Sequence, residues 1–237
     1  MSGLSNILNL LAGQTPQFLL FLGLAVVVLL LAAVAQRLEG SAFPRYFGRL
    51  HPLLAVSLVA LVGLAVWGYL LAAGLAVYRA GNLAGLLLGL GLALPFATVM
   101  ILVDRRAPFP PDLNVLPPAG YFFYPVVGFV VEVLFHLLPF AALYALLGFL
   151  PGIAPDLRLG LSIAVSALLE PLFQFALGTD HNTRPVLALM VLFLFFFNLT
   201  QLGLFVRYDF ASMYALRLGY YLLWHILWGQ RRLGLLF

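Results

Sequence analysis

Cysteine and lysine are both missing from this chain of 237 residues, and charged residues of any kind are scarce. Without cysteine there can be no disulfide, no thiolate metal site and no cysteine nucleophile. Without lysine there is no side-chain amine for a Schiff base, which excludes a retinal protein. Only 8% of the residues are charged, whereas 64% are hydrophobic. Soluble globular domains do not have this composition, so we predict a polytopic membrane protein.

Apolar runs long enough to cross a bilayer, which takes about twenty residues, occur seven times along the chain. These runs are residues 18–36, 53–78, 83–103, 121–150, 160–178, 185–206 and 210–229. The longest stretch between them, Asp104 to Gly120, is too short for a separate domain. We therefore predict an all-α integral membrane helix bundle of about seven transmembrane helices, forming a single transmembrane domain over residues 18–237. The mildly amphipathic segment 1–17 is expected to lie in the membrane interface.

The arginines are distributed unevenly between the two ends of the predicted bundle. One end carries Arg37, Arg45, Arg49, Arg105, Arg106, Arg184, Arg231 and Arg232, and the other carries Arg79, Arg158 and Arg207. The positive-inside rule then puts the N-terminus outside and the C-terminus in the cytoplasm, and we expect a bacterial inner-membrane protein. The net charge of +4 is scattered over loops. It fits contact with the anionic lipids of the bilayer and not with nucleic acid.

Ionisable side chains occur inside the predicted spans, where they are costly unless they face the bundle interior and find a partner. Glu132 and His136 are four residues apart, so they share one face of a helix. Glu170 and Gln174 have the same spacing, and Pro171 after the glutamate predicts a kink. Counting residues from the ends of the spans puts both glutamates near the middle of the bilayer.

The seventh span carries a polar stripe in which Arg217, Tyr221 and His225 follow one another at four-residue steps. This stripe could pass both glutamates. A buried ion pair between Glu170 and Arg217 would hold two helices together. On the sixth span, Asn198 and Gln201 are typical of hydrogen bonding between helices.

Three kinds of chemistry suit these groups. Glu132 could act as general base on a water while His136 or His225 polarises a carbonyl, which is a route to peptide hydrolysis without a covalent nucleophile. Glu132, His136, Glu170 and His225 could instead bind a first-row metal, although their spacing differs from the HExxH zinc motif. The two histidines could also be axial ligands of a haem. The residues alone do not decide whether a cofactor is bound, or which one.

The order of these elements over residues 121–229 resembles the CPBP family of membrane proteins, which includes CAAX prenyl endopeptidases and bacteriocin-processing proteins. That family carries a Glu-Glu-x3-Arg, a Phe-x3-His and a His-x3-Asn or His-x3-Asp motif. The segment LGLFVRYDFASMYALRLGYYLLWHILWG is similar to the last part of the family and aligns His225 with the third-motif histidine. Glu132 and His136 replace the ExxxR pattern, and Glu170–Gln174 takes the place of the second motif.

The chain departs from the family pattern at three points: the first motif has one glutamate, the second-motif helix has no histidine, and Gly229 replaces the last Asn or Asp. The resemblance implies a glutamate-activated water as the nucleophile. We therefore expect a divergent CPBP-like intramembrane protein, a glutamate-type peptidase for membrane-embedded or lipidated peptides, with Glu132 as base and His136 or His225 at the oxyanion. Supporting residues would be Glu170, Gln174, Asn198, Arg217 and Tyr221. The alternative is a non-enzymatic subunit among membrane protein partners, whose polar cluster is structural or ligates a haem or metal.

Overall fold

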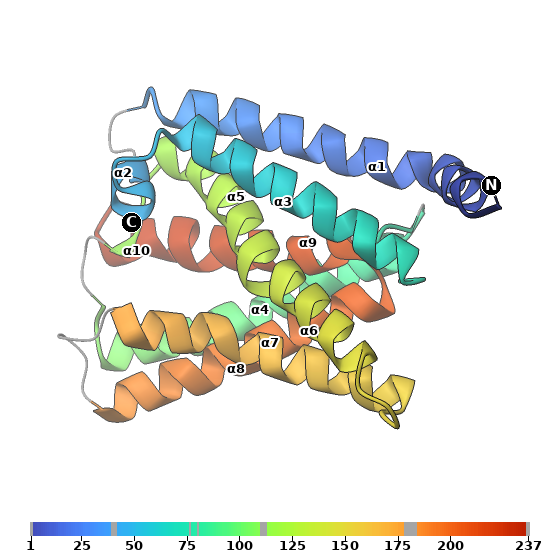
Figure 1. Cartoon of the computed structure of the whole chain (residues 1–237). Coiled ribbons are helices and arrows are strands. Elements are labelled where there is room, and N and C mark those ends of the chain that lie inside the picture. Colours follow the sequence, from blue (N-terminus) through green and yellow to red (C-terminus); the bar gives the residue numbers. More distant parts are fainter. Residues whose placement is uncertain are drawn as a thin grey trace.

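A computed structural model of the chain describes residues 2–38, 42–75, 77–79, 81–109, 113–177 and 184–235. Side chains are described from Thr15 onward within these ranges, apart from residues 177 and 184–187. The described residues are helical almost throughout and contain no strand, so the predicted all-α bundle is confirmed (Figure 1).

Six helices of the described chain are long and apolar enough to cross a membrane. They are α1 (Ser2–Ala35), α3 (Pro52–Ala72), α4 (Leu83–Arg106), the continuous helix made of α5 (Ala119–Val131), the π-helical η2 (Glu132–Leu137) and α6 (Leu138–Gly148), then α7 (Pro155–Leu177) and α8 (Arg184–Arg207). The seventh predicted span is helical too, but it consists of α9 (Phe210–Tyr220), the π-helical η3 (Tyr221–Trp228) and the short α10 (Gly229–Arg232). A short helix, α2 (Phe43–Phe47), lies in the first loop.

The N-terminal segment 1–17 was predicted as a separate interfacial element. In the structure α1 continues through residue 17 without a break, so this segment and the first span share one helix. Side chains before Thr15 lie outside the described residues, and the interfacial placement stays a prediction.

The outer surface of the bundle is covered by apolar side chains that have no partner in the fold. Leu30, Leu61 and Leu94, for example, are each about 60% exposed. Such a surface would be costly in water, but in a bilayer these side chains meet lipid chains as apolar as themselves. The polar side chains lie inside, which is the reverse of a soluble helix bundle.

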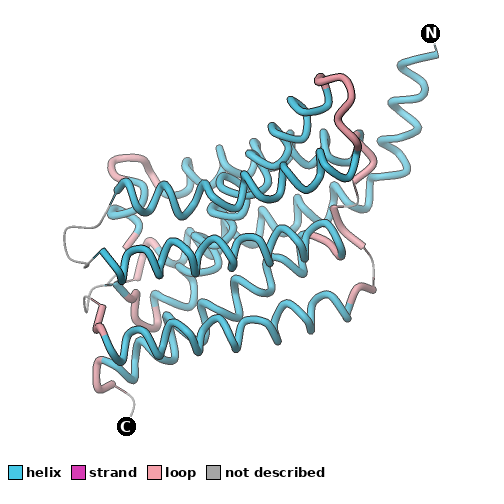
Figure 2. The backbone as a smooth tube through the Cα atoms, turned by 90° about the horizontal axis from the view of Figure 1, so that it is seen from below, coloured by secondary structure: helices cyan, strands magenta, loops and turns pink. Residues whose placement is uncertain are grey.

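The helices form two outer groups with a central helix between them (Figure 1). α1 packs on α3 and α5 on one side, and α7 packs on α8 on the other. The α5–η2–α6 helix crosses obliquely from the first group to α7, and α9 lies against α4, α8 and α5. The start of α1 and the end of α10 lie at opposite ends of the bundle (Figures 1 and 2).

The contact between α4 and α9 depends on glycine. The Cα of Gly89 approaches α9 so closely that a Cβ there would lie 3.2 Å from the backbone nitrogen of Leu216. Gly85 is likewise buried against α9, beside Ser212. These two glycines form a small-residue ridge that lets α4 and α9 approach closely. Gly81 lies before α4 in a turn with φ of +73°.

Candidate functional site

The two helices that carry the predicted catalytic residues each contain a π-helical stretch. Glu132 and His136 lie in η2, and Tyr221 and His225 lie in η3. Pro139 follows η2 and has no N–H, so it cannot extend the α-helical hydrogen-bond ladder into the preceding turn. π-Helical turns are rare and often occur at functional positions. The π-helical turns that carry these two pairs of residues make this part of the bundle a candidate functional site.

Arg217 on α9 joins the two buried glutamates. Its Nε donates to Glu132 Oε1 at 2.5 Å, and its NH2 donates to Glu170 Oε2 at 3.0 Å. A further contact from NH1 reaches Glu170 Oε1 at 3.4 Å, and NH1 also donates to the Tyr221 hydroxyl at 3.1 Å. The predicted ion pair between Glu170 and Arg217 is present, and the same arginine also neutralises Glu132. One guanidinium thus connects α5–η2, α7 and α9.

His136 lies between the two carboxylates. Its Nδ1 is 3.2 Å from Glu132 Oε2, as the i, i+4 spacing predicted, and its Nε2 is 3.7 Å from Glu170 Oε2. The ring is completely buried, and neither nitrogen makes a well-directed hydrogen bond within the described residues. His136 thus lies in contact with both carboxylates that Arg217 joins.

Gln201 on α8 completes this cluster. Its Nε2 donates to Glu132 Oε1, and its Oε1 accepts from Arg217 NH2 at 2.8 Å. The sequence had indicated only a general role for Gln201 in hydrogen bonding between helices. That role is confirmed for Gln201, and also for Asn198, whose Nδ2 donates to the carbonyl of Ala167 at 3.3 Å. We define the buried polar cluster by its members Glu132, His136, Glu170, Gln201, Arg217 and Tyr221.

A cavity of about 520 Å³ lies against one side of this cluster. Its walls are mostly apolar and aromatic, and it reaches from the cluster to α2 and to the loop after α4. Its polar lining comes chiefly from Glu170, Gln174, Arg217, Tyr221 and His225. Glu132 and His136 are fully buried and are not among the described residues that line it. Glu170 is therefore the carboxylate of the cluster that faces the cavity.

Gln174 supports Glu170 from the same helix. Its Nε2 donates to Glu170 Oε1 at 3.2 Å, which confirms that the four-residue spacing brings the two side chains together. Because Gln174 also lines the cavity, Glu170 is held in place by Gln174 and Arg217 together.

His225 lies at a different part of the cavity wall. Its ring stacks on Tyr124 with centroids 4.7 Å apart, and its Nδ1 lies 3.2 Å from Asn114 Nδ2. It forms no hydrogen bond or ion pair with either glutamate of the described chain. Tyr221, which touches both Arg217 and the His225 ring, lies between them. The predicted stripe along this helix is thus present, but its last member joins a second group of residues.

That second group holds the loop after α4, which carries Asn114, against the end of the cavity. The amide of Asn114 also donates to the carbonyl of His225 at 3.2 Å, and its oxygen accepts from Arg232 at 3.0 Å. The hydroxyl of Tyr124 accepts from the backbone nitrogen of Val115 at 2.7 Å. Sequence reasoning named none of these loop contacts, because a loop residue gives no periodic signal that places it over a particular helix.

A metal or a haem fits this arrangement poorly. The described residues contain no set of three His, Asp or Glu side chains placed to hold a metal ion. Arg217 occupies the space between the two glutamates, and both nitrogens of His136 face carboxylates. His225 Nδ1 faces an amide. The two histidines are therefore not arranged as a pair of axial haem ligands.

The chain was also compared with known proteins. No family model, no curated protein and no solved structure matches it, so the relationship to the CPBP family stays a hypothesis that rests on the quoted residues alone.

Proposed function

We propose that the chain is a divergent CPBP-like intramembrane peptidase, in which a glutamate activates a water against a membrane-embedded or lipidated peptide. The observation that carries this proposal is the position of Glu170 and Arg217 in the wall of an otherwise largely apolar cavity. An apolar pocket with a few convergent polar groups is the usual form of a site for an apolar ligand. Here the cavity would hold the apolar part of the substrate, and the polar wall would meet the bond to be cleaved.

In this proposal Glu170 is the general base, and Glu132 is a positioning residue. A base must reach the water whose proton it takes, and Glu170 faces the cavity whereas Glu132 lies behind Arg217. The hypothesis drawn from the sequence gave the base to Glu132; accessibility favours Glu170. Arg217, in the same wall, supplies positive charge for the oxyanion, a role expected earlier for His136 or His225.

The proposed reaction is a direct hydrolysis. The water oxygen attacks the peptide carbonyl carbon while Glu170 takes a proton from the water. The C–N bond then breaks, and the proton held by Glu170 passes to the leaving amine. No covalent enzyme intermediate is needed, which suits a chain without cysteine.

The test is cleavage of a panel of fluorogenic peptides by the purified chain in liposomes. The panel contains peptides with an acyl chain, with a prenyl chain and with an apolar spanning segment. We expect turnover of at least one member by the wild-type protein and a background rate with Glu170→Gln. Cleavage no faster than in liposomes without protein, across the whole panel, would contradict the proposal.

One observation favours the alternative, a non-enzymatic membrane subunit with a structural cluster. Each of the three guanidinium nitrogens of Arg217 already bonds to a side chain of the described cluster. A saturated network of this kind can serve to hold helices in register and to bind further membrane protein partners through the outer surface. In that case Glu170→Gln changes stability alone, and no panel peptide is cleaved.

Location in a bacterial inner membrane with a cytoplasmic C-terminus is also part of the proposal. It is supported by the apolar outer surface and by the arginine-rich loops at the end that carries α10. Because the chain has no cysteine, single-cysteine variants give an unambiguous labelling test. In intact cells a membrane-impermeant maleimide should label Leu150→Cys and should not label Leu235→Cys. The reverse pattern would mean the opposite orientation.

A further inference from the structure

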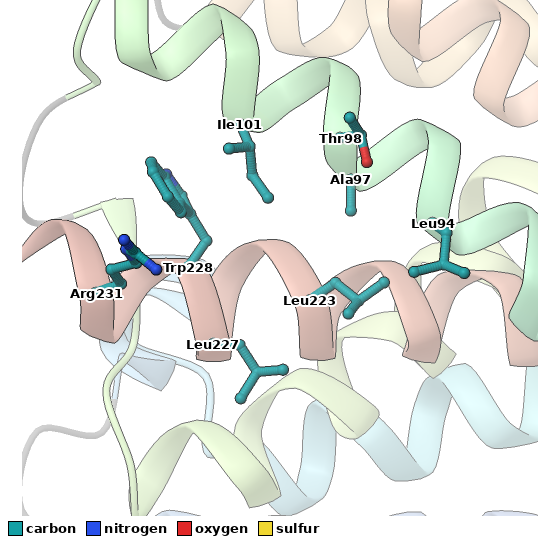
Figure 3. Close-up of a pocket in the computed structure, with 8 residues that line it drawn as sticks. All are labelled: Leu94, Ala97, Thr98, Ile101, Leu223, Leu227, Trp228 and Arg231. Carbon is teal, nitrogen blue, oxygen red and sulfur yellow. The ribbon is translucent and has the colours of Figure 1, made fainter. Parts of the chain in front are cut away.

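A second pocket, of about 370 Å³, is lined by residues of α4, η3 and α10. It is a groove between α4 and the C-terminal helix (Figure 3). Leu94 lies at one end, Trp228 and Arg231 lie at the other, and Ile101 and Leu223 line the space between them. Leu94 is 58% exposed, so the groove opens onto the outer, lipid-facing surface. It shares none of its lining residues with the cavity of the buried polar cluster.

Unpaired positive charge lies at one end of this groove. Arg231 is exposed and makes no hydrogen bond or ion pair with any described residue. Arg105 follows Ile101 by four residues on α4, so it continues the face of α4 that lines the groove. It is also exposed and has no partner in the described part of the chain.

The nearby carboxylate does not cancel this charge. Asp104 is buried, and its Oδ2 accepts from Trp228 Nε1 at 2.7 Å and lies 3.6 Å from Arg232 Nε. Its Oδ1 accepts from the backbone nitrogen of Phe109 at 2.9 Å. Asp104 is therefore already neutralised by Arg232. The hydrogen bond from Trp228 to Asp104 fixes the indole at the end of the groove, a usual position for tryptophan near a membrane surface.

We propose that this groove is a binding site for an anionic phospholipid. One acyl chain lies along the apolar length between α4 and η3, and the headgroup phosphate meets Arg231 and Arg105. The argument rests on complementarity: an apolar groove open to the bilayer that ends in uncompensated positive charge beside an interfacial tryptophan matches a lipid with a chain and a net negative headgroup. A zwitterionic lipid offers the same chain, but its own ammonium opposes the arginines.

Trp228 makes the proposal directly measurable. The chain has three tryptophans; Trp67 and Trp224 are each only 2% exposed, whereas Trp228 is partly exposed in the groove. The purified chain is reconstituted in phosphatidylcholine with a small fraction of a lipid whose acyl chains are brominated near the headgroup. The brominated lipid is either phosphatidylglycerol or phosphatidylcholine. Bromine quenches indole fluorescence on contact, so the quenching curve gives the relative affinity of the site for each lipid.

We expect brominated phosphatidylglycerol to be preferred about 25-fold, because each of the two arginines near the membrane surface provides about fivefold. Arg231→Gln should reduce this preference to about fivefold, and Trp228→Phe should remove the lipid-dependent quenching itself. Arg49→Gln, at an exposed arginine of the same end of the bundle, is the matched control and should leave the preference unchanged.

Either of two results overturns the assignment. Equal quenching by both lipids would mean that the groove does not select charge. A preference that is undiminished by Arg231→Gln but falls with Arg49→Gln would mean a diffuse attraction to the whole arginine-rich end. Both arginines are exposed and have no partners among the described residues, so neither variant is expected to disturb folding.

Discussion

Replacing Arg217 with glutamine should lower the free energy of unfolding by about 3–5 kcal/mol, the usual cost of leaving buried charges without their partner. Arg217 is only 2% exposed and pairs with both Glu132 and Glu170, which are themselves 0% and 4% exposed. Without the guanidinium, two carboxylates face each other across His136 inside the bilayer. The measurement is denaturant-induced unfolding of the purified protein in detergent, followed by tryptophan fluorescence.

Two further variants show whether charge is the cause. Arg49→Gln removes an exposed arginine without partners in the described chain, and it should change the stability by less than about 0.5 kcal/mol. A triple variant that combines Arg217→Gln with Glu132→Gln and Glu170→Gln removes the formal charges of all three side chains. It should regain much of the lost stability, because an uncharged buried network has no ion to desolvate. Equal stability of Arg217→Gln and Arg49→Gln would contradict the central place given to this ion-pair network.

Glu170→Gln should reduce the rate of peptide cleavage by about 10²–10⁴-fold while leaving the protein folded. Glutamine keeps the shape of the side chain and its bond to Gln174, and Arg217 retains Glu132 as a counter-ion. The loss is then one of chemistry, because an amide cannot take a proton from water. The rate constant is measured on the panel peptide that the wild-type protein cleaves, with the folded fraction determined on the same samples.

Glu132→Gln is the matched comparison. Glu132 does not line the cavity, but it bonds to both Arg217 and Gln201. Its loss should mainly weaken the fold and should lower the rate only as far as Arg217 moves. If Glu132→Gln abolished cleavage in a fully folded protein while Glu170→Gln remained active, the general base would be Glu132, as the sequence first indicated.

Much of this architecture could be predicted because the bilayer restricts what a chain can do. A segment that spans the bilayer in such a bundle must be helical and apolar, so long apolar runs predict helices with few alternatives. The same restriction makes each buried charge informative. Glu132 with His136, Glu170 with Gln174 and Glu170 with Arg217 were all expected to meet, and all three pairs do.

Contacts between helices that share no spacing rule were harder to predict. Four-residue steps put Arg217, Tyr221 and His225 on one stripe, but they do not say which neighbouring element each will meet. His225 contacts Tyr124 and Asn114, which come from a different helix and a loop. Which of the two glutamates faces the cavity could not be predicted from the sequence either. It depends on how aromatic side chains from many elements fill the space around them. Apolar periodicity says which face is inward and nothing about where packing leaves a cavity.

The position of Arg217 on α9, after the helices of both glutamates, has a consequence for how the protein is made. The helices that carry Glu132 and Glu170 leave the ribosome before α9 does. Until α9 enters the membrane, neither carboxylate has the counter-ion on which its burial depends. The two carboxylates can therefore be buried as ion pairs only after this late helix has docked against the earlier ones.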